Sequence, residues 1–541
     1  MKIQLISLLL SSLFFSFAIA RTINSKVFIK KKTQDTTDDA AASASPVPPT
    51  PQGSIRLGGD ILIPDASSEH PLILSNAKDQ PLCLPSETIK PVRDLKVMPG
   101  YEFFVLTNKI EYPKKIVMDK ANHLLAISSK NGVYSIRMDK CGNSEVQQIL
   151  EHNVLGEPLG MGMELYGQHL YISTTHSIYR FPYSDGQHSA LSDGIKVMSN
   201  MNSDNSEITD IAIDVFGYAF IPRTVSQMHQ NLDASHAVIK KFNFKNIPDS
   251  AYDFERDGEI FASGTNTQGL LGFDAQAQLW GINGLLEDAN LGRDLSLAGF
   301  AEELNKYSAP KKNYGFPYCL TEHNLQGISE VSRGLGAQWA HALFVNQSVS
   351  LNDYCQQSDN NVPPEVPLAP KTYASSAHFY TGVFCSVGDL TTEGTSVGLP
   401  CNWTNTPILA NHGQPRDPTG HSVVHLPFND LEHKPRLDLA AEVLLQETEP
   451  CFDDKCFSPF GLALDNYGRL YISSDETNEI IVFKRIFNEK AAETLTDIVE
   501  KAEDAKYEEE ERRKEKDSDG EETRKESGDN EEQKHKGSGD E

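Results

Sequence analysis

Short apolar runs separated by turns recur along the chain, and residues 457–486 show the pattern most clearly. In the runs 462–464 and 470–472, apolar residues alternate with smaller or polar ones, which is the period of a half-buried strand. Asn-Tyr-Gly at 466–468 is typical of a hairpin, because Asn and Gly tolerate positive φ. A third apolar run follows at 480–483. This stretch therefore predicts a three-stranded meander.

The same order of apolar run, turn and apolar run recurs at irregular intervals. One meander is not stable alone, but several around an axis form a propeller. We therefore predict an all-β fold, a six-bladed β-propeller with long inter-blade loops and disordered tails at both ends. A large β-sandwich or a double barrel is the alternative. The candidate blades lie at 115–136, 161–183, 209–224 with 237–244, 270–283, 406–413 with 421–428, and 457–486.

Both ends of the chain differ from this repeating part. Residues 1–20 have an early Lys, an apolar core and Ala-Ile-Ala, which is typical of a secretory signal peptide; a signal anchor is the alternative. Residues 21–56 are rich in Thr, Asp, Ala, Ser and Pro and predict a flexible linker. We expect the propeller at 57–488 and a charged disordered tail at 489–541, in which 489–506 could form a short amphipathic helix.

Charge and cysteine content agree with a secreted, extracellular protein. The formal net charge of −27 argues against a nucleic-acid partner, and no later segment has 18 consecutive apolar residues, so we expect no membrane span. Asn346 and Asn402 begin glycosylation sequons. Eight cysteines predict disulfides, although sequence alone leaves their connectivity open. Proximity favours Cys451–Cys456 and Cys385–Cys401, which leaves Cys319–Cys355 and Cys83–Cys141.

Three matches to catalytic or metal motifs lack the required context. Gly394–Gly398 fits G-x-S-x-G, but its flanks are loop-like rather than a strand and a helix. His421 and His425 lie four residues apart on a predicted strand, where a core role is the simpler interpretation. Asp517–Gly520 resembles part of a calcium loop without flanking helices.

Residues 290–319 form a long predicted insertion that carries most of the candidate chemistry. Loops of this kind build one rim of a propeller channel, where ligands bind. Oxygen donors suited to calcium are Asp294, Glu302 and Asn305. Aromatic residues that could stack on a flat ligand are Tyr314 and Phe316. A structural loop tied by a cysteine, with solvated carboxylates, is the alternative.

Several motifs, taken in order, resemble a known family. They are GRD at 292–294, AEELN at 301–305, NYGFPYC at 313–319, LPCNW at 399–403 and HGQPRDPTG at 412–420. The chain resembles the soluble quinoprotein glucose/sorbosone dehydrogenases, most closely the secreted fungal pyranose dehydrogenases that use pyrroloquinoline quinone. The resemblance implies a six-bladed propeller with the quinone and calcium over its channel. It also implies a His general base, hydride transfer from a sugar to the quinone, and a separate electron acceptor.

The chain departs from this family where the chemistry needs specific side chains. The expected third-blade His falls on Ser206 and the following Arg on Thr209, while the second-blade His falls on Met161. An expected Arg-Asn pair is replaced at 266–267, and a Trp-Asn pair at 414–415. Serine does not replace an imidazole as a base near neutral pH, and lost Arg residues weaken an anion site.

Two hypotheses follow. The first is an active quinone-dependent sugar dehydrogenase with a rearranged base, for which the candidates are His412, His176 and His229. The second is a propeller that kept the fold and lost the chemistry, and now binds a glycan or a protein outside the cell. Retained candidates for quinone contacts are Arg293, Arg416 and Tyr314. An unrelated propeller, of the lactonase or simple repeat type, is the alternative to the family assignment.

Overall fold

The structure is a computed structural model in which part of the chain is described. The described residues are 54–57, 61–64, 80–202, 206–208, 210–225, 234–267, 269–284, 299–308, 310–326, 332–341, 351–429, 433–495 and single positions between 497 and 512. The structure therefore does not address the predictions made for residues outside these ranges. Those predictions concern residues 1–53, Thr209, His229, Arg293, Asp294, Asn346 and 513–541.

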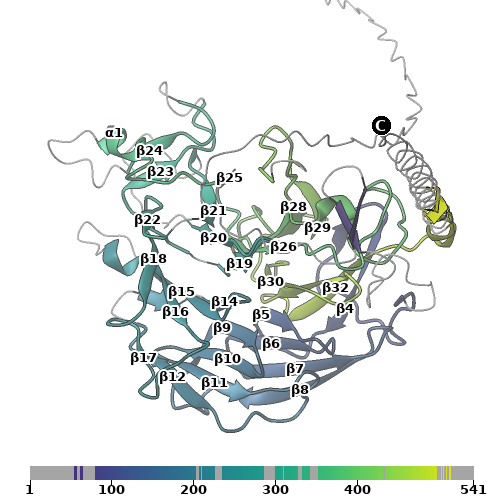
Figure 1. Ribbon diagram of the computed structural model, residues 1–541, viewed down its shortest axis with the longest axis horizontal. Helices are drawn as coiled ribbons and strands as arrows, with labels where there is room; N and C mark the ends of the chain where they lie inside the picture. Colours follow the sequence, from purple (N-terminus) through teal and green to yellow (C-terminus); the bar gives the residue numbers. More distant parts are fainter. Residues whose placement is uncertain are drawn as a thin grey trace, which may run out of the picture. The chain divides into compact units, whose positions relative to one another are not determined.

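Six antiparallel sheets surround one axis, which confirms the predicted six-bladed β-propeller (Figure 1). Blade one consists of β5 (Pro113–Met118), β6 (Leu124–Ser128), β7 (Gly132–Met138) and β8 (Ser144–Glu151). Blade two consists of β9 (Leu159–Tyr166), β10 (His169–Thr174), β11 (Ile178–Pro182) and β12 (Ile195–Ser199). Blade three consists of β14 (Ala212–Ile213) with β13 (Ser206–Ile208), β15 (Tyr218–Val225), β16 (Val238–Asn243) and β18 (Glu259–Ser263). Blade four consists of β19 (Gly272–Phe273), β20 (Leu279–Asn283), β21 (Glu302–Tyr307) and β25 (Val366–Leu368). Blade five consists of β26 (Ala374–Phe379), β27 (Pro407–Asn411), β28 (Ser422–His425) and β29 (Glu442–Glu447). Blade six consists of β30 (Pro459–Leu464), β31 (Leu470–Ser474), β32 (Glu479–Arg485) and β4 (Tyr101–Thr107).

Shorter elements extend the blades. They are β3 (Leu95–Val97) on β29, β17 (Tyr252–Asp253) on β12, β22 (Lys312–Asn313) on β18, the separate pair β23 (Cys319–Thr321) and β24 (Gln338–Ala340), and the helix α1 (Leu351–Cys355). At the start of the described residues, β1 (Ser54–Leu57) pairs with β2 (Ile61–Pro64), so the end of the predicted linker is in a strand.

An aspartate closes the turn between the first two strands in four of the blades. In the sixth blade, Asp465 Oδ1 accepts hydrogen bonds from the backbone N–H groups of Tyr467 and Arg469, both at 2.9 Å. The same pattern, to the residues two and four positions further on, occurs at Asp119, Asp214 and Asp274. Because a short carboxylate can satisfy a turn's backbone donors, it fixes the hairpin that the sequence pattern predicted.

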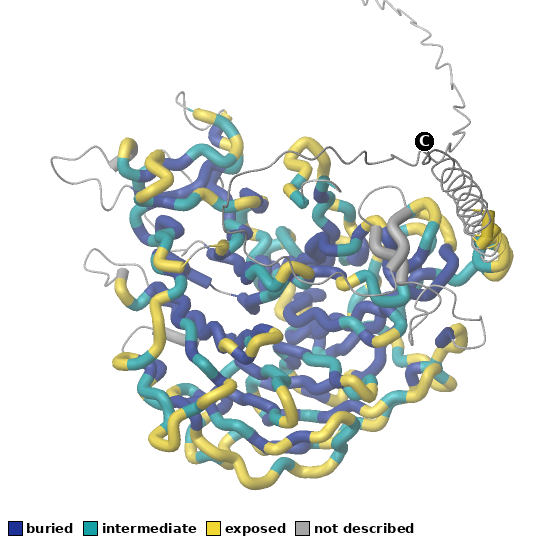
Figure 2. The backbone as a smooth tube through the Cα atoms, in the orientation of Figure 1, coloured by how far each residue is buried: buried dark blue, intermediate teal, exposed yellow. Residues whose placement is uncertain are grey.

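These turns define two ends of the channel. The innermost strands are β5, β9, β14, β19, β26 and β30, and neighbouring ones contact each other around much of the ring. We call the end where they begin the upper face and the end of the aspartate turns the lower face. Figure 2 shows mostly buried backbone near the axis and exposed backbone in the outer loops.

The ring closes by pairing the two ends of the propeller sequence. Strand β4 forms the outer strand of the sixth blade through an antiparallel register that pairs Phe483 with Phe103 and Arg485 with Tyr101. The Tyr101 ring stacks on Phe483 with centroids 5.0 Å apart. Because one blade combines strands from both ends of the sequence, opening the ring would break a whole strand pair.

The four predicted disulfides are all confirmed. They join Cys83–Cys141, Cys319–Cys355, Cys385–Cys401 and Cys451–Cys456. After the sixth blade, residues 489–495 are helical, within the stretch predicted as a short amphipathic helix. Among the described helices, none has the length and apolar character needed to cross a membrane.

Truncation of Ile481 should destabilise the closing blade. This side chain is fully buried in β32, between β31 and β4. We expect Ile481→Ala to lower the free energy of unfolding by about 3 kcal/mol, because the vacated space is only partly refilled. Urea unfolding followed by circular dichroism measures the change. Val215→Ala, at a side chain 79% exposed, is the control and should change stability by less than about 0.5 kcal/mol. An equal effect of both variants would contradict the argument.

Candidate functional site

Three blades contribute to a polar network on the upper face. Lys114 lies near the start of β5, Asp475 directly follows β31, and His412 directly follows β27. The Asp475 carboxylate accepts hydrogen bonds from Lys114 Nζ and from His412 Nε2, the latter at 2.9 Å to Oδ1. Lys114 Nζ lies 4.3 Å from the centre of the Phe460 ring, which the His412 ring approaches edge-on. We call Lys114, His412, Phe460 and Asp475 the rim network.

Burial and charge pairing set the ionisation of this network. The Asp475 side chain is 1% exposed, while those of Lys114 and His412 are 19% and 17% exposed. Burial alone would raise the pKa of Asp475, but His412 and then Lys114 outweigh it and lower this pKa to about 2. Asp475 is therefore a carboxylate under all ordinary conditions, and solvent reaches the two groups that bind it.

His412 does not have the geometry of a free general base. Its Nε2 faces the Asp475 carboxylate, and its Nδ1 lies 2.7 Å from the Gly413 carbonyl oxygen. Both neighbours can only accept hydrogen bonds, so neither ring nitrogen is directed at a group from which it could take a proton. The second catalytic candidate, His176, lies in the β10–β11 loop with its side chain exposed, and its backbone N–H donates to Glu157.

The described candidates for quinone contacts lie in other surroundings. Arg416 forms a bidentate ion pair with Asp454, in which the two side chains are 73% and 66% exposed. Tyr314 is buried, packs edge-on against Tyr307 at 4.8 Å, and donates its hydroxyl to the Lys306 carbonyl. Neither residue belongs to the rim network.

The two proposed calcium donors that the structure describes, Glu302 and Asn305, are not brought together. Glu302 and Asn305 point to opposite faces of β21, because side chains alternate along a strand. The Glu302 carboxylate accepts hydrogen bonds from the Thr372 hydroxyl and from the N–H groups of Tyr373 and Ala374, at 2.8–3.0 Å. Glu302 thus anchors the start of β26, and burial outweighs these bonds and raises its pKa.

A buried polar group that the sequence analysis did not select surrounds the next residue, Glu303. Its carboxylate accepts a hydrogen bond from the Thr321 hydroxyl at 2.6 Å and lies 3.5 Å from Asn305 Nδ2. Two buried amide atoms in this group, Asn305 Oδ1 and Asn283 Nδ2, make no hydrogen bond. Burial raises the pKa of Glu303 to about 7. Strand alternation could have revealed this pairing, because residues 303 and 305 share a face.

Asn266 occupies a position at which the family resemblance implies an Arg, and its neutral amide is hydrogen-bonded through both its oxygen and its nitrogen. Asn266 Oδ1 accepts from the Thr224 hydroxyl and the Val225 N–H, and its Nδ2 donates to the Gly284 carbonyl at 3.3 Å. Ser206, at the expected His position, begins β13 and pairs with Val225. Met161 lies in β9 and is half-buried.

A second ionic cluster lies inside the channel. Lys115 Nζ donates to Asp210 at 2.7 Å, to the Ile211 carbonyl at 2.8 Å and to Glu164 at 3.3 Å. Asp210 also accepts from the Leu271 N–H at 2.9 Å. Burial raises the pKa of Glu164, and the Lys115 charge offsets only part of that effect. We call Lys115, Glu164 and Asp210 the channel cluster.

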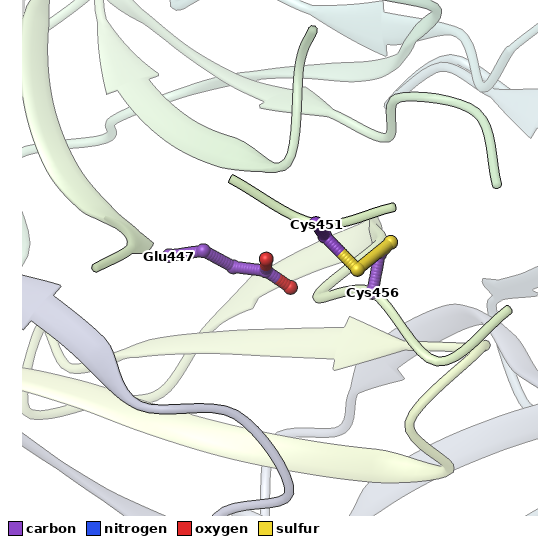
Figure 3. A group of neighbouring side chains, drawn as sticks. All are labelled: Glu447, Cys451 and Cys456. Carbon is purple, nitrogen blue, oxygen red and sulfur yellow. A yellow bond between two sulfur atoms is a disulfide. The ribbon is translucent and has the colours of Figure 1, made fainter. Parts of the chain in front are cut away.

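The remaining motif matches are structural in this fold. The Ser396 hydroxyl of the G-x-S-x-G match donates to the Phe384 carbonyl within a loop. His421 and His425 are both buried, and each hydrogen-bonds to neighbouring groups. Among the described residues, one group of potential metal ligands is close enough to share an ion: Glu447, Cys451 and Cys456. Its two sulfur atoms form a disulfide and are therefore not thiolate ligands (Figure 3).

Comparison with known proteins agrees with this architecture. The TrAA12-like family model matches residues 95–486. A pyrroloquinoline quinone-dependent sugar dehydrogenase of Hypocrea jecorina (strain QM6a) is 21% identical over 406 residues, which cover 71% of this chain and 88% of that protein.

Solved structures share the fold. A Carbohydrate-Active Enzymes family AA12 protein of Trichoderma reesei, in its iodide structure, superposes with a TM-score of 0.62 at 20% identity, covering 74% of this chain and 100% of that one. The holo form of the pyranose dehydrogenase PQQ domain from Coprinopsis cinerea gives a TM-score of 0.61 at 18% identity, covering 75% and 100%.

The propeller and the family match together define the class, which is that of the pyrroloquinoline quinone-dependent sugar dehydrogenase-like propellers. Within it, the chain belongs to the TrAA12-like family, and the resemblance inferred from the sequence motifs is confirmed.

Removal of the Asp475 charge should destabilise the protein in a pH-dependent way. The folded-state pKa is depressed from 3.8 to about 2. The resulting stabilisation of about 2 kcal/mol is therefore fully present above pH 5 and falls to about half at pH 3. We expect Asp475→Asn to lose this amount at pH 7 and less at pH 3 in urea unfolding. Asp454→Asn, at an exposed ion pair, is the control and should lose less than about 1 kcal/mol. A loss that does not change with pH would count against the rim network.

Glu303→Gln should have the opposite effect on stability to Asp475→Asn. The folded-state pKa of Glu303 is raised from 4.5 to about 7, so the charged form opposes folding and wild-type stability falls as pH rises from 4 to 8. We expect the variant to be more stable than wild type by about 3 kcal/mol at pH 8 and about equal at pH 4. Thermal unfolding at the two pH values measures this. A variant that is less stable at pH 8 would show that the carboxylate charge is compensated in the folded protein.

Proposed function

We propose that this protein is a secreted TrAA12-like propeller that binds a sugar or glycan at the upper mouth of its channel without oxidising it. The observation that carries the proposal is the Asp475 carboxylate, which engages both Lys114 and His412. The two solvent-accessible basic groups of the rim network are thereby committed to a partner within the protein.

The first support concerns the proton. Oxidation of a sugar hydroxyl requires a base within hydrogen-bond reach that has a free lone pair. Both ring nitrogens of His412 face acceptors within the protein, and its Asp475 partner has a pKa of about 2, too low for efficient proton abstraction near neutral pH. Within the described rim network, neither residue is arranged to take the proton.

The second support concerns the cofactor. Pyrroloquinoline quinone carries carboxylates, which bind best to Arg and Lys side chains through charged hydrogen bonds worth about 1.5–3 kcal/mol each. Asn266 stands at an expected Arg position, and Arg416 pairs with Asp454 at the surface. The described residues at these positions do not fit the quinone, and Glu302 and Asn305 do not converge on a calcium ion.

A neutral, hydroxyl-rich ligand suits what the rim network offers. Hydrogen-bonding groups of both kinds are present, their charges are paired within the protein, and Lys114 and His412 retain access to solvent. A sugar can exchange hydrogen bonds with such groups without bringing in a charge. The relatives named above act on sugars or belong to carbohydrate-active enzymes, which supports the ligand class.

Secretion rests on two features. Residues 1–20 have the pattern of a signal peptide, and four disulfides are typical of an oxidising compartment. Asn402 is exposed, as glycosylation of its sequon requires.

An active dehydrogenase is the second candidate function, and family membership favours it. It requires the His412 imidazole to leave the Asp475 carboxylate and to bind the sugar hydroxyl instead.

A calorimetric titration of the full secreted chain tests the proposal. With pyrroloquinoline quinone and calcium we expect no saturable heat up to high-micromolar quinone, and no dye reduction over a panel of pyranoses. A glycan array should show binding that Lys114→Ala weakens and that Lys109→Ala, at an exposed side chain, leaves unchanged. One-to-one quinone binding with dye reduction would establish the dehydrogenase instead. Absence of any glycan signal would overturn the binding role.

A further inference from the structure

The channel holds a cavity at the end opposite the rim network. Its volume is about 430 Å³, within the usual range for ligand pockets. Its walls include the residues with which four innermost strands end: Met118, Phe273, Phe379 and Leu464. The rim network lies where these strands begin, so the cavity belongs to the lower face and is a separate site.

The channel cluster supplies charge to this cavity, because Lys115 and Glu164 line it, whereas Asp465, which also lines it, is paired with Arg469. All three protons of the Lys115 ammonium are used, by Asp210, Glu164 and the Ile211 carbonyl. Glu164 is less occupied: one oxygen receives the longest of these bonds, at 3.3 Å, and the other receives the Leu165 N–H at 3.1 Å. A carboxylate can accept about four hydrogen bonds, so Glu164, which lines the cavity and whose side chain is 23% exposed, retains capacity for a further donor.

The net charge of the channel cluster favours a cationic ligand over an anionic one. With both carboxylates ionised, one ammonium and two carboxylates give the channel cluster a net charge of −1; burial raises the pKa of Glu164 and of Asp210, and a bound cation favours their ionised forms. An anion finds no free proton on Lys115, whereas a cation finds spare oxygen on Glu164. Burial lowers the pKa of His378, which also lines the cavity, to about 4, so this imidazole adds no positive charge at neutral pH. The other walls are mainly apolar, including Leu271 and Leu462.

We propose that the lower cavity binds a small organic cation, a primary ammonium carrying an apolar chain. The ammonium donates to Glu164, and the chain lies against the apolar ends of the innermost strands. A bare metal ion fits less well, because calcium requires six to eight oxygen ligands and the cavity presents one carboxylate with spare capacity among apolar walls. This site is independent of the sugar-binding role proposed for the upper face.

Calorimetry with three probes of equal length tests the charge preference on the full secreted chain. The probes are n-hexylammonium, n-hexanol and n-hexanoate. We expect hexylammonium to bind one-to-one and at least about tenfold more tightly than the other two, which is the discrimination that one charged hydrogen bond provides. Equal binding of hexylammonium and hexanol, or no binding of hexylammonium, would overturn the proposal.

Two variants locate the site. Glu164→Gln removes the charge at nearly unchanged volume and should abolish the preference for the cation. Met118→Trp enlarges a side chain that lines the cavity at the end of β5 and should weaken hexylammonium binding by at least about tenfold. Glu145→Gln, at an exposed carboxylate, is the matched control and should leave binding unchanged. Wild-type affinity in both cavity variants would place the ligand elsewhere and refute the assignment, even if glycan binding persisted.

Discussion

The structure depends on the pairing of β4 with β32, which closes the ring. This pairing makes the sixth blade from both ends of the propeller sequence and brings β30 next to β5. The ion pair between Lys114 and Asp475 joins residues of the first and sixth blades, and His412 adds the fifth. The rim network therefore exists only in the closed ring, so that folding and site assembly are one event.

The local part of this fold could be predicted from the sequence, because its signals lie within a few residues. The alternating pattern and the Asn-Tyr-Gly turn predicted the hairpin at 457–486. Asp465 fixes the register of this hairpin through its hydrogen bonds to the turn. The recurrence of the pattern predicted the six-bladed ring, and the family resemblance implied the same fold. Strand alternation in β21 would also have separated Glu302 from Asn305 and grouped Glu303 with it, had it been applied to the candidate metal ligands.

The candidate site could be predicted only in part, because its chemistry depends on partners distant in sequence. His412 was selected from the sequence, but Asp475 and Lys114 lie 63 and about 300 positions away along the chain and carried no motif. An imidazole with one nitrogen facing the substrate can act as a base, whereas one whose nitrogens both face acceptors within the protein is not placed to do so. Residue type thus predicted where a polar site would be, and tertiary contacts decide what it can do.

The way charges are balanced at the two ends of the channel distinguishes their roles. At the upper face, Asp475 offsets the basic groups, and Asn266 fills an expected Arg position with hydrogen bonds to its own surroundings. The charges of the rim network are therefore paired within the protein, without a charged ligand. In the channel cluster one carboxylate remains uncompensated at a solvent-accessible cavity. Because burying an unpaired charge is costly, a cation there would stabilise the fold that binds it.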